Sequence, residues 1–288
     1  MKVVITGADG QLGQCLQDRL SNTPNKVFPL SRRGLDITDT EAVLDHIVAI
    51  DPDVIINAAA YTAVDKAESD TEAAWAVNAK AVENLASAAN NVSALFVHVS
   101  TDYVFDGSSS SPYKEADPVN PTGVYGASKL AGEKAAQQAE RHIIVRTAWV
   151  FSEYGHNFLK TMVRLAGERD SLSIVNDQTG TPTYAGDLAA ALVHLSEALP
   201  ANGVYHFSGG EACTWFDFAR AIFATCEELS EGFNMPQLTP ISSSEFPTPV
   251  RRPAYSVLDG QRLKEEASVS AGDWRIALLP VCKKVLSL

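Results

Sequence analysis

The amino-acid sequence predicts an α/β protein: a Rossmann-type, doubly wound parallel sheet followed by a smaller mixed α/β C-terminal substrate domain. Short apolar runs alternate with helical stretches from residue 2 to residue 147, and a glycine-rich turn follows the first run. Alternation of this length predicts parallel strands joined by right-handed crossovers. We expect an NAD(P)-binding domain over residues 1–150 and a mainly substrate-binding domain over residues 151–288, with some later segments returning to the first domain.

The opening segment has the order that a dinucleotide site requires. A strand is predicted over Lys2–Thr6, then the turn Gly7-Ala8-Asp9-Gly10-Gln11-Leu12-Gly13, then a helix that continues through Leu20. Glycines permit a tight turn and let a pyrophosphate approach the helix N-terminus, whose free N–H groups and dipole favour anions. We therefore expect Gly7, Gly10 and Gly13 to form a cofactor-binding turn.

The second predicted strand, Val27–Leu30, ends in residues that bear on the choice of cofactor. The segment Ser31-Arg32-Arg33 follows it, and no Asp or Glu stands at the end of the strand. An acidic residue there would hold the ribose 2′-hydroxyl of NAD, whereas arginine accommodates the 2′-phosphate of NADP. The sequence thus favours NADPH over NADH, although two arginines in a surface loop can also be merely solvated.

The next stretch predicts a helix, a strand and a loop of small residues. Thr40–Ile50 has helical periodicity, Val54–Asn57 is the third strand, and Ala58–Thr62 leads out of it. Small side chains in this loop would let the backbone approach a cofactor. A long alanine-rich helical region is predicted from about Thr71 to Asn90, and its Asn78 is either an ordinary helix residue or a polar buttress.

A tyrosine–lysine pair carries the predicted chemistry. Tyr125 and Lys129 are four residues apart on a helix predicted from about Pro121 to Glu140, so both lie on one helical face. A neighbouring ammonium lowers the pKa of a phenol and fits tyrosine for general acid–base work. Thr101 follows the apolar run Leu95–Val99 and would stand at the C-terminal tip of a strand, where ligands of open α/β sheets bind.

The remaining sequence predicts a fifth strand and then a less regular half. The strand spans His142–Thr147. Beyond residue 150 we predict helices over Asn157–Ala166, Gly186–Leu199 and Trp215–Glu228, and short strands at Ile174–Val175 and Val204–Ser208. Proline-rich loops then precede Arg251-Arg252-Pro253.

Composition narrows the class of protein. The chain has 288 residues and a formal net charge of −12, which argues against non-specific binding to nucleic acid or to anionic membranes. No apolar run approaches the length of a membrane span, and no signal segment precedes the first strand. The four cysteines form no Cys-x-x-Cys pair and the six histidines show no metal-ligand spacing, so we expect a cytoplasmic protein without a metal site.

These motifs together resemble those of the dTDP-4-dehydrorhamnose reductases, a family of the extended short-chain dehydrogenase/reductase superfamily. The resemblance covers nearly the whole chain. The Tyr-x-x-x-Lys pair identifies only the superfamily, whereas the segments 57–68 and 100–107 are more specific. The segments that carry it are Gly7–Gly13, Asn57–Glu68, Ser100–Gly107, Tyr125–Lys129, Arg146–Val150 and Arg251–Pro253.

The resemblance implies reduction by NAD(P)H of the C4 keto group of a dTDP-linked 4-keto sugar, dTDP-4-dehydro-L-rhamnose, which gives dTDP-L-rhamnose. Tyr125 would protonate the developing alkoxide, Thr101 would hydrogen-bond the same oxygen, and Lys129 would bind the nicotinamide ribose and lower the pKa of Tyr125. The implied cofactor residues also include Gly10, Gln11 and Leu12 at the pyrophosphate, Asp36 and Ile37 at the adenosine, and Ala58, Ala60, Tyr61 and Thr62. The implied substrate residues are Thr101, Asp102, Val104, Phe105, Trp149 and Asn157, with Arg251 and Arg252 either clamping the nucleotide pyrophosphate or forming a surface pair.

Two departures and two alternatives accompany this interpretation. Some relatives carry glutamates proposed to hold magnesium between subunits, and this chain has Cys15 and Gly186 at those positions instead. The departure argues against a magnesium-bridged dimer and leaves monomer and homodimer open.

A dehydratase or epimerase is one alternative function, but Thr101-Asp102-Tyr103 lacks the glutamate of the dehydratase acid–base pair. A non-catalytic NADP-binding regulatory subunit, as of methionine adenosyltransferase, is the other, although Thr101, Tyr125 and Lys129 are all present.

Overall fold

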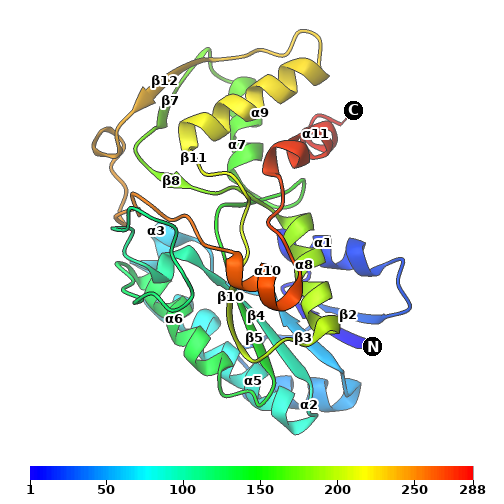
Figure 1. Ribbon diagram of the computed structural model, residues 1–288. Helices are drawn as coiled ribbons and strands as arrows, with labels where there is room; N and C mark the ends of the chain where they lie inside the picture. The colour runs from blue at the N-terminus through cyan, green and yellow to red at the C-terminus, as the bar shows by residue number, and fades with distance from the viewer. Residues whose placement is uncertain (288) are drawn as a thin grey trace.

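A parallel sheet of six strands forms the lower half of the computed structural model, which describes residues 1–287 (Figure 1). Its strands are β1 (Lys2–Thr6), β2 (Lys26–Leu30), β3 (Val54–Asn57), β4 (Leu95–Thr101), β5 (His142–Thr147) and β10 (Gly203–His206). Their order is β10-β5-β4-β3-β1-β2, and every pairing is parallel. The order reverses between β1 and β3, and ligands of doubly wound sheets bind in the crevice at such a reversal. The predicted fold class is confirmed.

Apolar side chains alternate between the two faces of this sheet. Val3 and Ile5 pack under α1 (Gln11–Leu20), α8 (Ala185–Ala198) and α10 (Gln261–Ala267). Val4, between them in sequence, packs on the opposite face under α2 (Thr40–Ile50), α5 (Ala81–Asn91) and α6 (Val124–Ala136). Figure 1 shows these two sets of helices on opposite sides of the strands. Because both faces are covered, the central strands read as continuous apolar runs.

Side-chain caps fix where several helices begin. The Asp39 carboxylate accepts a hydrogen bond from the Ala42 N–H at the start of α2. Thr214 and Asp217 form a capping box at the start of α9 (Trp215–Leu229). Asp273 caps α11 (Trp274–Val285), a helix that the periodicity of the sequence did not reveal. Such caps satisfy N–H groups that the helix itself leaves unpaired.

The predicted alanine-rich helical region is confirmed, and it contains a π-helical turn. It consists of α4 (Thr71–Trp75), the π-helical turn (Ala76–Lys80) and α5, after the short helix α3 (Val64–Ala67). At this turn the Asn78 side chain accepts from the Tyr61 N–H at 2.8 Å and donates to the Tyr61 carbonyl at 3.1 Å and to Ser128 Oγ at 3.1 Å. Asn78 is therefore a polar buttress, in a kind of turn that often marks functional sites.

Helix α6 ends four residues before the predicted end at Glu140. The amide of Asn90, from the neighbouring α5, donates to the Gln138 carbonyl and accepts from the Glu140 N–H. These two hydrogen bonds give the backbone after α6 partners outside the helix, and the chain turns into β5.

The C-terminal half supplies the upper part of Figure 1. Three helices, α7 (Phe158–Ala166), α9 and α11, enclose a core that includes Phe218, Phe223 and Trp274. Three pairs of short strands border it: β6 (Val150–Phe151) with β9 (Thr183–Tyr184), β7 (Ser171–Val175) with β12 (Gln237–Ile241), and β8 (Thr179–Gly180) with β11 (Cys213–Thr214).

Three elements of this half return to the large sheet. Strand β10 pairs with β5 at the edge of the sheet, α8 packs against α1, and α10 packs on the same face. Residues beyond 150 thus contribute one strand and two covering helices to the domain that carries the large sheet. Within residues 1–287, no helix combines the length and apolar character needed to cross a bilayer.

Candidate active site

The glycine-rich turn between β1 and α1 forms one wall of the site. Gly7 has a φ of +71°, and a Cβ at this position would lie 2.6 Å from the backbone nitrogen of Ala59. A Cβ on Gly13 would lie 2.2 Å from the Gly7 carbonyl oxygen. Within the described chain no side chain caps Gly10 at the start of α1, so the first N–H groups of that helix are available to an anion. The turn fits a pyrophosphate.

A cavity of about 740 Å³ opens from this turn across the C-terminal ends of the strands. It has the volume of a typical ligand site. Among the predicted cofactor residues, Gly13 and Arg33 do not line it: Gly13 packs against the Gly7 carbonyl, and Arg33 is exposed to solvent. Those that do line it are Gly7, Gly10, Gln11, Leu12, Ser31, Arg32, Asp36, Ile37, Ala58, Ala60, Tyr61, Thr62, Tyr125 and Lys129.

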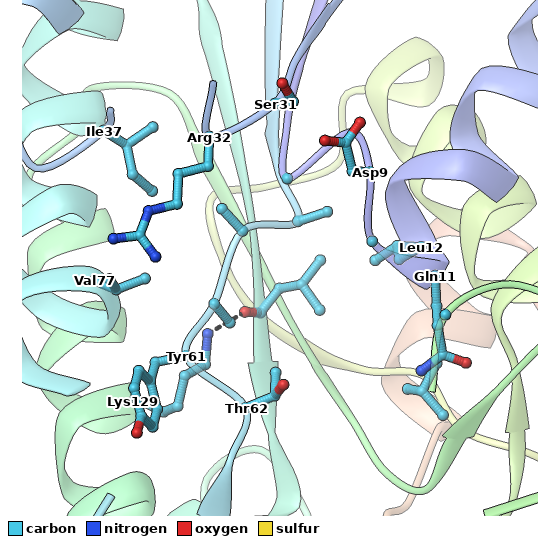
Figure 2. A pocket seen from close by; sticks show the side chains of 18 of the residues that line it. Asp9, Gln11, Leu12, Ser31, Arg32, Ile37, Tyr61, Thr62, Val77 and Lys129 are labelled. Atoms are coloured by element: carbon cyan, nitrogen blue, oxygen red, sulfur yellow. Dashed lines mark hydrogen bonds between the residues drawn. The ribbon is translucent and has the colours of Figure 1, made fainter. Parts of the chain in front are cut away.

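One end of the cavity carries a cation and a carboxylate. The guanidinium of Arg32 extends toward Ile37 and Val77 (Figure 2). Nearby, Asp36 accepts hydrogen bonds from the N–H and the hydroxyl of Thr38, which lower the pKa of Asp36. Asp36 is therefore charged at neutral pH, and Arg32 is the one arginine of the predicted pair that faces the cavity.

Thr101, Tyr125 and Lys129 come together where β4 ends beside α6. Tyr125 and Lys129 occupy successive turns of α6 and line the cavity. The Nζ of Lys129 donates to the Val99 carbonyl at 2.7 Å, which is the dashed line in Figure 2. Thr101 lies beside the Tyr125 hydroxyl and acts to lower its pKa. The structure thus unites the three residues that the sequence analysis selected.

The prediction that Lys129 lowers the pKa of Tyr125 is wrong in this structure. Burial raises the pKa of Tyr125 far above its ordinary value, and only the neighbouring Thr101 side chain opposes that rise. The ammonium of Lys129 is instead directed to the Val99 carbonyl, and its own pKa is lowered to about 8 by desolvation. Tyr125 therefore carries its proton at neutral pH, which is the state that a general acid needs.

Among the residues that the structure describes, none of the predicted substrate residues lines this cavity, and Asp102 is buried beside Thr101 at the end of β4. Its Oδ1 accepts a hydrogen bond from Thr101 Oγ1 at 3.0 Å, and burial raises its pKa to about 6. Val104 and Phe105 lie differently from expectation. Both side chains are fully buried in a small core with Tyr113 and do not reach the cavity, so they support the loop from behind.

Trp149 and Asn157 are held by contacts of their own. Trp149 has a φ of +47°, and its indole stacks on Trp215 with ring centroids 3.5 Å apart. Asn157 caps α7 and donates through Nδ2 to the Gln11 side chain at 2.8 Å. Asn157 thus connects the C-terminal half to the N-terminus of α1.

The two predicted arginines near the C-terminus separate. Arg252 forms an ion pair with Asp65 and donates to the Tyr103 hydroxyl at 3.0 Å. Arg251 is exposed to solvent. Arg252 therefore ties the late proline-rich segment to the loop after β4, and the pyrophosphate role of both arginines stays a prediction.

Sequence reasoning missed several residues that line the cavity. Ala73, Ala76 and Val77 come from the alanine-rich helical region, and nothing in its composition marks the face that they share. Gly155 and His156 come from the C-terminal half; Gly155 has a φ of +58° and a Cβ there would lie 3.0 Å from Gln11 Cγ. In the sequence, the one sign of these cavity residues is the pair Gly155-His156 itself, which follows Trp149 in a loop.

Residues 1–287 contain no group of three or more His, Cys, Asp or Glu side chains arranged to hold a metal ion. Cys15 and Gly186 stand where some relatives carry the glutamates proposed to hold magnesium. Cys15 is buried, and Gly186 packs closely on the ring of Tyr184. All four cysteines are free and buried.

A doubly wound sheet with a glycine-rich turn and a tyrosine–lysine pair beside its cavity defines the class as an NAD(P)-binding enzyme of the short-chain dehydrogenase/reductase type. Within that class the chain belongs to the family described as RmlD substrate binding domain, which matches residues 1–287. It is similar to a dTDP-4-dehydrorhamnose reductase of Aggregatibacter actinomycetemcomitans, with 44% identity covering 96% of this chain and 97% of that relative.

Solved structures agree with this assignment. A dTDP-4-dehydrorhamnose reductase from Clostridium acetobutylicum superposes with a TM-score of 0.94 at 39% identity, over 100% of both chains. One from Bacillus anthracis, in complex with NADP, superposes with a TM-score of 0.92 at 38% identity, over 97% of this chain and 98% of that one.

Proposed function

We propose that the chain catalyses NADPH-dependent reduction of the C4 keto group of dTDP-4-dehydro-L-rhamnose to give dTDP-L-rhamnose. The observation that carries this proposal is a cavity that fits a dinucleotide and is lined by Tyr125 and Lys129, with Thr101 beside Tyr125 at the end of β4. The family membership and the names of the relatives support the choice of substrate. NADH is the alternative cofactor.

The residues of the chain divide the work as follows. When bound, NADPH would supply the hydride that reduces C4 of the sugar. Tyr125 gives the proton on its hydroxyl to the O4 oxygen as the carbonyl double bond breaks, and Thr101 hydrogen-bonds that oxygen. Lys129 holds the ribose of the cofactor, and Asp102 and Trp149 contact the sugar. Fixing both reactants on rigid elements, the end of β4 and the first turns of α6, supplies the orientation on which the rate depends.

A spectrophotometric assay tests the function. We expect rapid loss of NADPH absorbance with freshly generated dTDP-4-dehydro-L-rhamnose, and little loss with a GDP-linked keto sugar. Rapid oxidation with both sugars would contradict the choice of nucleotide. Silence with both, together with measurable NADPH binding, would favour a regulatory subunit instead.

The position of Arg32 leads to a prediction about cofactor choice. Because the Arg32 side chain faces the cavity and that of Arg33 does not, Arg32→Ala should reduce the preference for NADPH over NADH by about tenfold or more, the scale of a lost charge-assisted contact. Arg33→Ala is the matched control and should change the ratio little. The measurement is kcat/KM for each cofactor at fixed salt. Equal effects of the two substitutions would contradict the assignment of the 2′-phosphate site to Arg32.

We also propose that the protein works in the cytoplasm as a monomer or a homodimer. The four free, buried cysteines support a reducing compartment. Light scattering on the purified protein distinguishes the two assembly states.

A further inference from the structure

A buried ion pair lies directly behind the catalytic residues and has no part in the mechanism above. Arg146 on β5 donates to Glu133 on α6 through Nε and Nη2, both at 2.8 Å. The two side chains are only 5% and 3% exposed. Removing two charged groups from water is costly, and a buried pair is weak evidence for stability by itself. The question is therefore what else this pair does.

The Glu133 carboxylate has a third partner, which connects it to the site. Ser100 Oγ donates to Glu133 Oε1 at 2.5 Å. Ser100 immediately precedes Thr101 on β4, lines the cavity, and is the register partner of Arg146 on β5. One carboxylate thus ties α6 to the ends of both strands. These three elements carry Tyr125 and Lys129, Thr101, and the backbone that leads to Trp149.

The far side of Arg146 offers no alternative counter-charge. Its Nη1 lies 3.4 Å from His206 Nε2, and its guanidinium stacks over the Phe105 ring at 5.1 Å. Burial lowers the pKa of His206 to about 3, so this imidazole is neutral. Among the residues that the structure describes, Glu133 is the one carboxylate in an ion pair with Arg146.

Glu133 also stands one helical turn after Lys129, close enough for the two charges to interact. The titratable groups that interact with Lys129 are Glu133 on α6 and His98 on β4, and Tyr125 lies one turn before it on α6. His98 is neutral because burial lowers its pKa well below the ordinary value. Desolvation lowers the pKa of Lys129 to about 8, and the Glu133 carboxylate acts in the opposite direction. Glu133 is the one anion of this group.

We propose that Glu133 is a positioning residue of the reductase site: from behind α6 it places a carboxylate one helical turn from Lys129 and holds Ser100 and Thr101 in register with Tyr125. This inference rests on the proposed role of Lys129 in cofactor binding. Glu133 would thus contribute to the site although its carboxylate does not line the cavity.

Cofactor affinity as a function of pH tests the proposal. We would measure the dissociation constant of NADPH by fluorescence between pH 6 and 10 for the wild type, Glu133→Gln and Arg146→Lys. In Glu133→Gln, Lys129 loses its neighbouring anion, so its proton leaves at lower pH. The pH at which affinity begins to fall should therefore move down by about one to two units, the size expected for removal of a unit charge one turn away. Arg146→Lys keeps the carboxylate and should leave this pH unchanged.

The outcomes separate this inference from the proposed function. An unchanged pH dependence in Glu133→Gln, or an equal shift in Arg146→Lys, would overturn the positioning role. The readout is binding, so it does not depend on turnover of the dTDP-sugar; a wild type that binds NADPH but reduces no sugar would overturn only the proposed function. If Glu133→Gln fails to fold, Glu133→Gln with Arg146→Met removes both buried charges, a change that proteins often tolerate. It should still move this pH down, by less because a cation is removed with the anion, and no downward shift would overturn the proposal.

Discussion

Replacing Tyr125 by phenylalanine is expected to lower the turnover number about a hundredfold or more, the usual contribution of a general acid. The reason is specific to this site. Burial raises the pKa of Tyr125, so its hydroxyl is protonated at neutral pH, and Thr101 lies beside it. The ring itself packs edge-on against Tyr103 with centroids 5.5 Å apart, and phenylalanine preserves that contact. The measurement is kcat with saturating NADPH and sugar substrate.

Two controls make this result interpretable. The dissociation constant of NADPH should stay nearly constant in Tyr125→Phe, because the turn at Gly7–Gly13 and Lys129 are unaltered. Tyr205→Phe removes another phenol hydroxyl, one that donates to the Ala201 carbonyl far from the cavity, and should leave kcat nearly unchanged. Undiminished turnover in Tyr125→Phe would exclude Tyr125 as the acid.

Replacing Gly7 by alanine should have the second large effect, this time on cofactor binding and stability together. A side chain at a φ of +71° is strained, and its Cβ would lie 2.6 Å from the Ala59 nitrogen. The strain and the overlap should cost about 2–5 kcal/mol in the free energy of unfolding. Because relief requires the turn to move away from the Ala58–Thr62 loop, NADPH affinity should fall at least tenfold.

Gly34→Ala is the matched control for this experiment. Gly34 lies after β2, and an added Cβ would meet its nearest neighbour, the Ser31 carbonyl oxygen, at an ordinary 3.6 Å. We expect little change in denaturant midpoint or NADPH affinity. If Gly7→Ala behaved like Gly34→Ala, the argument that this turn needs a residue without a side chain would be refuted.

The sheet could be predicted from the sequence because its signals are local. The strands Lys2–Thr6, Val54–Asn57 and His142–Thr147 coincide with β1, β3 and β5, since each is a continuous apolar run bounded by polar or small residues. The π-helical turn at Asn78 escaped prediction because it depends on Tyr61 and Ser128, which lie far away in sequence. Tertiary hydrogen bonds of that kind leave no periodic trace.

The residues of the candidate site likewise fall into those that local sequence signals predict and those whose properties depend on tertiary contacts. Tyr125, Lys129 and Thr101 were found because spacing and strand ends reveal them, and the glycine-rich turn because its conformation demands particular residues. The direction of the pKa of Tyr125 was not predictable, because spacing indicates proximity to Lys129 but not the competing Val99 carbonyl or the extent of burial. Val104 and Phe105 belong to a segment with the family pattern, yet they serve its packing.

The return of β10 and α8 to the first sheet has a consequence for how the protein is made. Until residue 206 leaves the ribosome, β5 is an unpaired edge and the apolar side of α1 has no helix to cover it. An exposed edge strand and a bare apolar face are where nascent chains associate wrongly. The cofactor-binding layers therefore cannot mature as an independent unit during synthesis, and the two halves of the chain should melt in a single cooperative transition.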